Sequence, residues 1–388
     1  MCGISSGFPF ANRRTNSKIA FMKVPPKLGQ TFQTRVLLLL SLISISTSSR
    51  AQSPEVDQIR SHAEAGEPEA QNTMGLACKN GHGVPQDFAQ ALKWFQKAAD
   101  KGNPAAERNL AMMYADGQGT SQDYAEAAKW LRKAAEQNFT SAQNHLAMLC
   151  LDGKVPGADS NEGVKWLRKS AEANYAEAQD NLGVLYLYGK GVPENLPEAI
   201  LWFRKAADQN YASAQDHLGN LYVEGKGVPL DYSKALEFYH QAVVQNYAAS
   251  ETTLGWMYAE GKGVTQTDAE AAKWFRRAAD QNYASAQNQL GAMYEKGRGV
   301  PQDFVKAVDL FRKAAERGYG GAQNNLAIAY ALGEGVPKDQ VEAYFWFALA
   351  STHGDHERAD LRDAATAQLK PEQIAEADKR VKAFVPKS

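Results

Sequence analysis

The residues of this 388-residue chain that could do chemistry are few and widely spaced. His145 and His217 are the only histidine pair in equivalent sequence contexts, and they stand 72 positions apart. Cys78 and Cys150 are separated by the same interval. Two histidines can share a metal, and two cysteines can form a disulfide, only if the fold brings them together.

A glycine-rich motif is the next candidate, since Gly-Lys-Gly occurs at 189–191, 225–227 and 261–263. A phosphate-binding loop has a longer glycine spacing and a Ser or Thr after the lysine. His353 and His356 have no further His or Cys beside them, so a surface role fits them better than metal binding. We find no nucleophile–base arrangement, and the sequence predicts no catalytic residue, no cofactor and no metal site.

The spacing of these residues reflects a sequence unit that is repeated eight times. An Ala or Ser recurs every 36 residues without insertion or deletion, at Ala70, Ala106, Ala142, Ala178, Ala214, Ser250, Ala286 and Ala322. Such self-similarity indicates a stacked array in which each unit buries its apolar side against its neighbours. Equivalent residues two units apart lie nearly 20 Å from each other at a helix-packing distance of about 9 Å. We therefore expect Cys78 and Cys150 to be buried, separate thiols.

Each unit reads as two helices. The first ends at a Gly in all eight copies, and the second begins at an Asp, Asn or Thr suited to an N-cap and ends at Gly or Asn. In six copies a Gln or Glu three residues after the N-cap predicts a reciprocal capping box. An aromatic pair such as Trp274-Phe275 is expected to fill the core.

The columns together read A-x-x-x-[LM]-[GA]-x-x-[YC]-x-x-G-x-G-V-[PTS]-x-[DNT], then A-x-x-W-[FL]-x-x-A-A. This pattern resembles the Sel1-like repeat family, relatives of the tetratricopeptide repeats, over residues 55–354. The resemblance implies an all-α fold, a right-handed α-solenoid of eight helix–turn–helix repeats that serves as an interaction scaffold. Some relatives carry a Cys pair in every repeat and are linked to β-lactam binding; this chain lacks those pairs, so that activity is not transferred.

The ends of the array have their own features. Residues 52–65 match the second half of a unit and predict an opening half-repeat, so that the solenoid spans 52–354. Residues 355–388 predict two helices with a charged side, at about 355–368 and 371–384. A polar terminal unit keeps a solenoid from exposing its core, and we expect a C-terminal cap rather than a separate binding module.

Residues 1–51 have the features of a signal peptide. Arg35 precedes the apolar run 36–45, and Ser49 and Ala51 suit a cut before Gln52. Ten apolar residues are too few to span a bilayer, which needs about twenty, although an uncleaved anchor is the alternative. Met22 offers a more usual start for such a leader. We therefore expect a periplasmic or secreted protein without a membrane span after cleavage.

The charge balance argues against a nucleic-acid partner, because the chain has 43 Lys and Arg residues and 44 Asp and Glu residues. One basic column, represented by Arg132, is followed four residues later by acids such as Glu136. That spacing predicts ion pairs within a helix, so we expect a solvated face whose charges compensate one another.

The first helix of each unit leaves the positions equivalent to 72, 73, 76 and 79 on one face, which is the concave face in helix-pair solenoids. The first two positions form a row of amides and carboxylates, and the third varies most, as expected for specificity or for neutral drift. Trp256 is surplus to the core pattern and predicts either a binding hot spot or a gap filler. The predicted binding residues are Asn144, Met148, Asp180, Asp216, Asn220, Trp256, Asn288 and Asn324.

We therefore predict an exported, non-enzymatic scaffold that binds a protein or peptide partner along the concave face. The alternative is a cell-envelope assembly factor that binds a polysaccharide or the complex that makes or exports it. Amide groups and a tryptophan ring suit sugars as well as peptides.

Overall fold

The computed structural model describes residues 54–352 and 359–387, and every regular element within them is a helix. The first helices of the eight repeats are α3 (Pro68–Asn80), α5 (Pro104–Asp116), α7 (Thr140–Leu151), α9 (Ala176–Tyr188), α11 (Ala212–Glu224), α13 (Ala248–Glu260), α15 (Ala284–Lys296) and α17 (Gly320–Leu332). The second helices are α4 (Phe88–Ala99), α6 (Tyr124–Glu136), α8 (Ser160–Glu172), α10 (Leu196–Asp208), α12 (Tyr232–Val244), α14 (Asp268–Asp280), α16 (Phe304–Glu316) and α18 (Gln340–Thr352). The ends are α2 (Pro54–Glu64), α19 (Ala359–Thr366) and α20 (Pro371–Ala383).

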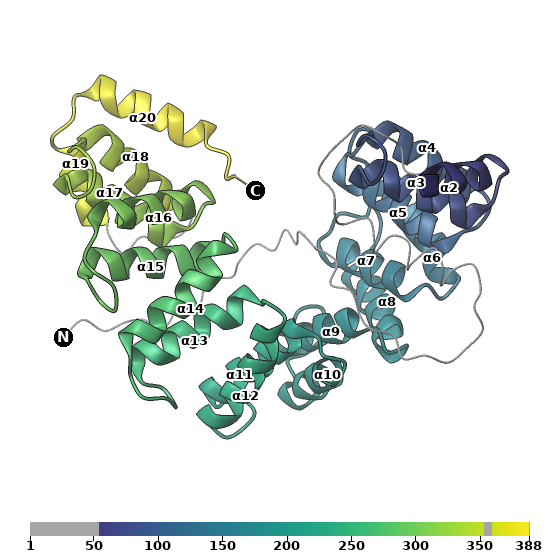
Figure 1. The fold of residues 1–388 in the computed structure, drawn as a ribbon, viewed down its shortest axis with the longest axis horizontal. Coiled ribbons are helices and arrows are strands. Elements are labelled where there is room, and N and C mark those ends of the chain that lie inside the picture. Colours follow the sequence, from purple (N-terminus) through teal and green to yellow (C-terminus); the bar gives the residue numbers. More distant parts are fainter. Residues whose placement is uncertain (1–53, 353–358, 388) are drawn as a thin grey trace.

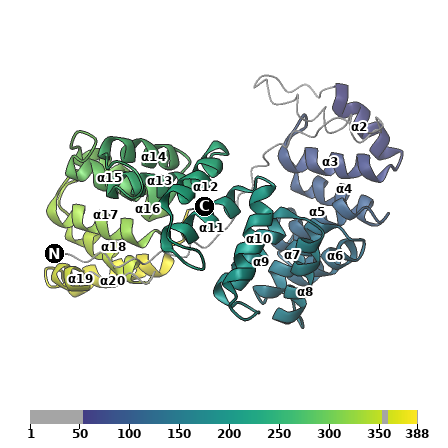
Figure 2. The same cartoon turned by 90° about the horizontal axis from the view of Figure 1, so that it is seen from below.

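From α2 to α19, each helix packs against the next along the chain, as the repeat pattern predicts. Figure 1 shows the helix pairs following one another along an open arch, with α2 near one end and α20 at the other. In the view from below, the pairs again lie in chain order from α2 to α18 (Figure 2). The all-helical repeat fold predicted from the sequence is therefore confirmed, while the predicted segment 1–51 lies outside the described residues.

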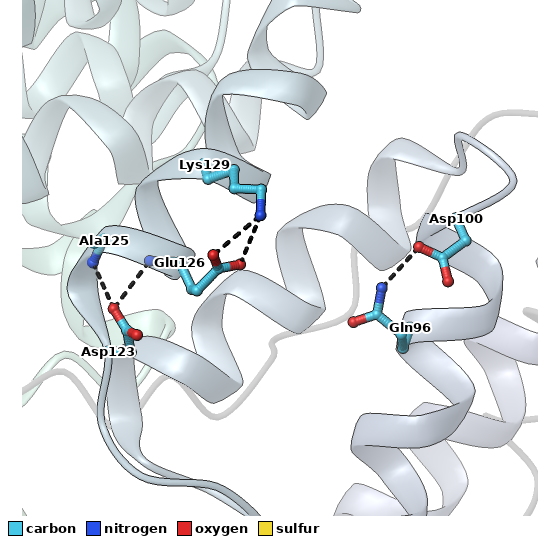
Figure 3. Close-up of polar contacts among 6 residues, drawn as sticks. All are labelled: Gln96, Asp100, Asp123, Ala125, Glu126 and Lys129. Atoms are coloured by element: carbon cyan, nitrogen blue, oxygen red, sulfur yellow. Dashed lines mark hydrogen bonds and ion pairs between the residues drawn. The ribbon is translucent and has the colours of Figure 1, made fainter.

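The N-caps of the second helices are formed as predicted, with one exception. Asp123 accepts hydrogen bonds from the backbone N–H groups of Ala125 (2.9 Å) and Glu126 (3.0 Å) at the start of α6 (Figure 3). Equivalent bonds begin α4, α8, α10, α12, α16 and α18. Thr267 is the exception, because its hydroxyl donates to the Thr265 carbonyl instead of capping α14.

The reciprocal half of the predicted capping box is wrong for the second helices. The glutamate side chains three residues after the N-cap contact other groups: Glu126 binds Lys129 (Figure 3), Glu162 binds Arg132, and Glu198 accepts from the Trp202 indole. At α6 and α10 the N-cap N–H is not available to the glutamate, because it donates to a carbonyl of the preceding first helix, as Asp123 N does to Tyr114 O at 2.8 Å. The N-cap residue alone therefore starts each of these helices.

The chain reverses where the sequence predicts. Asn138, Asn174, Asn210, Asn246 and Asn282 have φ between 58° and 64°, in the left-handed region that Asn and Gly enter most easily. Gly189 at the end of α9 has φ 63°, and its counterparts after the other first helices are also left-handed. These residues end both helices of a repeat, which fixes the repeat length.

The core of a repeat pairs a large second-helix residue with a glycine of the first helix. Phe203 is fully buried, and a Cβ on Gly183 would lie 2.7 Å from its ring. The Gly and aromatic residue also face each other in four other repeats, where the glycines are Gly75, Gly219, Gly255 and Gly291. Where the large residue is Leu131 or Leu167, the glycine is replaced by Ala111 or Ala147. In these two repeats the smaller Leu accompanies the larger Ala, which keeps the core filled. The eighth repeat instead pairs Ala327 with Phe347, and both are buried.

The expectation that Trp274 belongs to the core is wrong. Phe275 is 3% exposed, whereas Trp274 is only partly buried. The guanidinium of Arg277 lies 5.6 Å from the Trp274 ring centroid, and Lys97 covers Trp94 in the same way at 4.4 Å. A residue that follows at i+3 on a helix lies over the same face. The Trp274 ring also meets His240 of the preceding repeat, at 6.3 Å between ring centroids, so it lies at the edge of the core.

Both ends of the array are covered by helices. At the start, Val56 of α2 is buried and Gln71 of α3 donates to the Ala63 carbonyl at 3.0 Å. At the other end α19 and α20 pack on α18. There Arg380 forms a 2.7 Å ion pair with Glu342. The segment predicted as a C-terminal cap thus supplies the last packing layer.

Candidate functional site

The predicted binding residues lie on the first helices of six consecutive repeats. Asn144 and Met148 belong to α7, and Asp180 belongs to α9. The others are Asp216 and Asn220 on α11, Trp256 on α13, Asn288 on α15 and Asn324 on α17. We call the surface at the positions equivalent to 72, 73 and 76 the first-helix face.

The 72 and 73 positions hydrogen-bond to each other across repeat boundaries. At each of three repeat boundaries, one hydrogen bond joins two asparagine side chains. Asn109 donates to Asn72 (2.9 Å), Asn181 to Asn144 (3.0 Å) and Asn325 to Asn288 (2.9 Å). Between α9 and α11, His217 Nδ1 lies 2.8 Å from Asp180 Oδ1. The amide row therefore joins the first helices of consecutive repeats.

The expectation that this row is exposed is wrong for four residues. Asn144 and Asp180 are 1% exposed, Asn324 is 4% exposed and Asp216 is 6% exposed. Asp216 accepts from the Ser250 hydroxyl at 2.6 Å. Because first helices pack directly on one another, polar groups between them lose water and pair with protein groups. These side chains are not free to hold the backbone of a peptide.

The other four predicted residues remain accessible to different degrees. Asn220 and Asn288 are partly buried, and Asn220 Oδ1 accepts from the buried Tyr239 hydroxyl at 2.7 Å. Met148 is partly buried, and Trp256 is 38% exposed. Lys262 lies 5.8 Å from the Trp256 ring centroid. Among the predicted residues, Trp256 offers the largest accessible apolar surface.

Trp256 belongs to a stripe that continues along the first helices. The 76 position of every repeat is partly or largely exposed, and seven of the eight side chains are apolar: Leu76, Met112, Met148, Val184, Asn220, Trp256, Ala292 and Ile328. We call this set the first-helix stripe. Trp256 is the exposed member of this stripe, and the others are half-buried. A continuous, partly accessible apolar row of this kind is typical of an interaction surface.

A basic pair interrupts the amide row between α5 and α7. Arg108 occupies a column that is mostly Asn, and its Nη2 lies 3.2 Å from His145 Nε2. His145 Nδ1 lies 2.6 Å from the Ser141 carbonyl oxygen and must donate to it. Burial, together with the charge of Arg108, lowers the pKa of His145. His145 is thus held neutral, with Nε2 as the acceptor for Arg108.

Two buried glutamates stand in a column that is otherwise glutamine. In five repeats this Gln donates to the last turn of the preceding helix, as Gln143 does to Ala135. Glu251 is fully buried, and Arg277 supplies the missing donor, with Nη2 2.7 Å from the Val243 carbonyl and Nε 2.6 Å from Glu251. Burial raises the pKa of Glu251 above its usual value. Glu251 and Arg277 together therefore make the hydrogen bond to the preceding helix that a single Gln makes in five other repeats.

The basic column on the second helices does not pair within its own helix as predicted. Arg168 donates to the Tyr186 hydroxyl of the next repeat at 2.8 Å, and Arg204, Arg276 and Arg312 reach equivalent tyrosines. Arg132, which meets Cys150 in place of tyrosine, pairs with Glu162 at 3.1 Å. The hydroxyl of the next repeat is a fixed partner, whereas an exposed i+4 pair contributes little.

The cysteines are buried and free, as expected. Burial raises the pKa of the Cys150 thiol to about 11 and also raises that of Cys78. Neither thiol has the low pKa of a nucleophile. His353 and His356 lie outside the described residues; within residues 54–352 and 359–387, no group of three or more His, Cys, Asp or Glu is placed to hold a metal ion. No helix in that same part is long and apolar enough to cross a bilayer.

Sequence reasoning missed the glutamine column and the role of Arg108. Both signals were present: a Gln or Glu follows each repeat's recurrent Ala or Ser, and Arg108 departs from an Asn-rich column. Their meaning depends on which helix they face, and the repeat pattern alone does not give that.

The helix pairs, their shared boundaries and the open first-helix face define the class of the protein, a helical repeat array. The match to known families agrees: Sel1 repeats are matched at 68–103, 104–139, 140–175, 176–211, 212–246, 248–283, 284–319 and 321–355. The chain therefore belongs to the Sel1 repeat family. This fold is a non-catalytic protein-interaction scaffold.

One solved structure of the same family has a similar fold. A Sel1 repeat protein from Oxalobacter formigenes is 28% identical, with a TM-score of 0.58 over 88% of this chain and 98% of that chain. The protective antigen c5321 of uropathogenic Escherichia coli, which displays an SLR fold, is 29% identical over 85% of this chain and 78% of that chain, with a TM-score of 0.46. No match was found among curated proteins.

Proposed function

We propose that this protein is a non-enzymatic scaffold that binds an extended peptide segment of a partner protein along its first-helix face, the concave face of the solenoid. The observation that carries the proposal is the first-helix stripe. Its members recur once per repeat, and none of them is fully buried by a neighbouring helix. A row of apolar side chains fits a segment that presents apolar side chains at matching intervals.

The bonding of the amide row favours a peptide over a polysaccharide. A sugar-binding surface needs amides and carboxylates with free donors and acceptors. Here Asn144 and Asp180 are buried and bonded across repeat boundaries. Apolar side chains dominate what is left on the face, and they suit the side chains of a peptide.

Affinity capture by residues 52–388, followed by identification of the bound material, tests this function. We expect a protein partner, and we expect Trp256→Ala to weaken its capture because Trp256 is the largest accessible apolar side chain of the face. Trp94→Ala is the matched control, since it removes a partly buried tryptophan from a second helix. Binding to a glycan array without any peptide binding, or equal loss of capture in both variants, contradicts the proposal.

We also propose that the protein is exported by way of residues 1–51. The support is the apolar run 36–45 behind Arg35 and the small residues before Gln52. N-terminal sequencing of the periplasmic or secreted product should begin at Gln52. An intact 35–51 segment recovered in a membrane fraction contradicts cleavage.

A further inference from the structure

Arg108 is the least explained charge on the first-helix face. It belongs to α5, and the Met112 side chain of the first-helix stripe follows it by one turn of the same helix. The Arg108 Nη1 donates to Asn109 Oδ1 at 3.0 Å, and Nη2 lies 3.2 Å from His145 Nε2. These bonds use two of the five N–H groups that a guanidinium carries.

Within residues 54–352 and 359–387, the remaining donors of Arg108 have no hydrogen-bond partner. Its Nε is buried and has no hydrogen-bond acceptor among the described residues. No carboxylate of the described chain lies within 4.0 Å of the Arg108 guanidinium, whereas Arg132, Arg277 and Arg298 each have one. Burial lowers the pKa of Arg108. A desolvated guanidinium without a counter-ion is costly to the fold.

The described residues around Arg108 do not supply a counter-ion. Glu177 and Asp116 are near enough to favour the charged form of Arg108, but neither lies within ion-pair distance. The Glu177 carboxylate instead accepts from the Tyr175 hydroxyl at 2.9 Å. His145 cannot neutralise Arg108, because it is a neutral acceptor held by Ser141.

We propose that Arg108 is an anchor for an aspartate or glutamate side chain of the bound peptide. A carboxylate is the anion whose two oxygens match the donor pairs of a guanidinium. The stripe continues on both sides of Arg108, from Leu76 to Met148, so the peptide passes over this point and contributes a side chain rather than its C-terminus. The partner is therefore an acidic–apolar segment. This inference rests on the proposed function.

The choice of test variant follows from the repeat pattern. Asn occupies the Arg108 position in four other repeats, so Arg108→Asn replaces the arginine with a residue that the array already accommodates. Arg168→Asn is the matched control, because it removes an arginine that donates to Tyr186 on the second helices. Thermal unfolding of both variants establishes that they fold.

The experiment selects peptides from a random library fused through its C-termini to a phage coat protein, so that no peptide carries a free C-terminal carboxylate. Wild type and Arg168→Asn should select peptides with one fixed Asp or Glu among apolar residues, and Arg108→Asn should not. In a selected synthetic peptide with an amidated C-terminus, changing that acid to its amide should weaken binding to wild type at least tenfold. The same change should not alter binding to Arg108→Asn.

The outcomes separate the two proposals. Peptides that bind wild type without a fixed acidic residue, or an acid preference that survives Arg108→Asn, overturn the anchor and leave the scaffold function standing. A selection that yields no binder to wild type overturns both.

Discussion

At the scale of single residues, burial distinguishes two aromatic side chains of the same repeat. Trp256 is 38% exposed and Phe275 is 3% exposed. We expect Trp256→Ala to change the free energy of unfolding by less than about 0.5 kcal/mol. Phe275→Ala should cost about 3–5 kcal/mol, because it leaves a cavity against Gly255. Denaturant unfolding of both variants measures the difference, and equal losses would show that Trp256 belongs to the core.

A second prediction at this scale concerns acid. His145 has a lowered pKa because it is buried and faces Arg108, so the unfolded chain takes up a proton more readily than the folded one. The stability that neutral His145 contributes is complete above its unfolded pKa of about 6.5. It is lost as the pH falls from there through the folded-state value.

The measurement compares wild type with His145→Asn, since Asn109 and Asn181 occupy the same column. Between pH 7 and pH 5 the melting temperature of wild type should fall more steeply than that of the variant. Parallel curves for the two proteins would contradict a neutral, buried His145.

At the scale of helices, the Gly–Phe contact sets the distance between the two helices of a repeat. A Cβ on Gly183 would lie 2.7 Å from the Phe203 ring, so Gly183→Ala should destabilise the protein by about 1–3 kcal/mol although Ala favours helices. Adding Phe203→Leu should recover part of that loss, as in the Ala111–Leu131 and Ala147–Leu167 repeats. A double-mutant cycle measures the coupling, and strictly additive effects would contradict this packing.

The Glu251–Arg277 pair gives the second prediction for helix contacts. Arg277→Ala should cost about 2–3 kcal/mol, because it leaves the Glu251 carboxylate buried without its cation. Glu251→Gln in that background should restore most of the stability, since a Gln at this column donates to the preceding helix in five repeats. Unfolding curves of the single and double variants decide this. A double variant that is no more stable than Arg277→Ala would show that a Gln at position 251 cannot replace the Glu251–Arg277 pair.

The sequence predicts the helices well because their ends depend on local chemistry. An N-cap aspartate such as Asp123 and a left-handed residue such as Asn138 act within one turn of their own helix. It predicts the binding face poorly, because a polar residue such as Asn144 is exposed or buried according to the neighbouring repeat. The burial of Trp274 depends on the neighbouring repeat in the same way, because His240 of that repeat covers its ring together with Arg277.

At the scale of the whole molecule, the array exposes two different surfaces. Hydrogen bonds between side chains join first helices to first helices, as between Asn109 and Asn72, and Arg132 joins α6 to α8 by its bond to Glu162. The second helices carry lysines such as Lys93 and Lys165 at exposed positions, whereas the first helices carry the apolar first-helix stripe. We therefore expect the partner to bind the surface formed by the first helices only.

Site-specific photo-crosslinking tests that assignment most directly. A photoreactive residue would replace Met148 or Val184 of the first-helix stripe, and in control proteins Lys93 or Lys165 of the second helices. On irradiation with the partner obtained by affinity capture, we expect covalent adducts from the Met148 and Val184 positions and none above background from Lys93 or Lys165. Adducts from the second-helix positions, with none from the first-helix stripe, would contradict it.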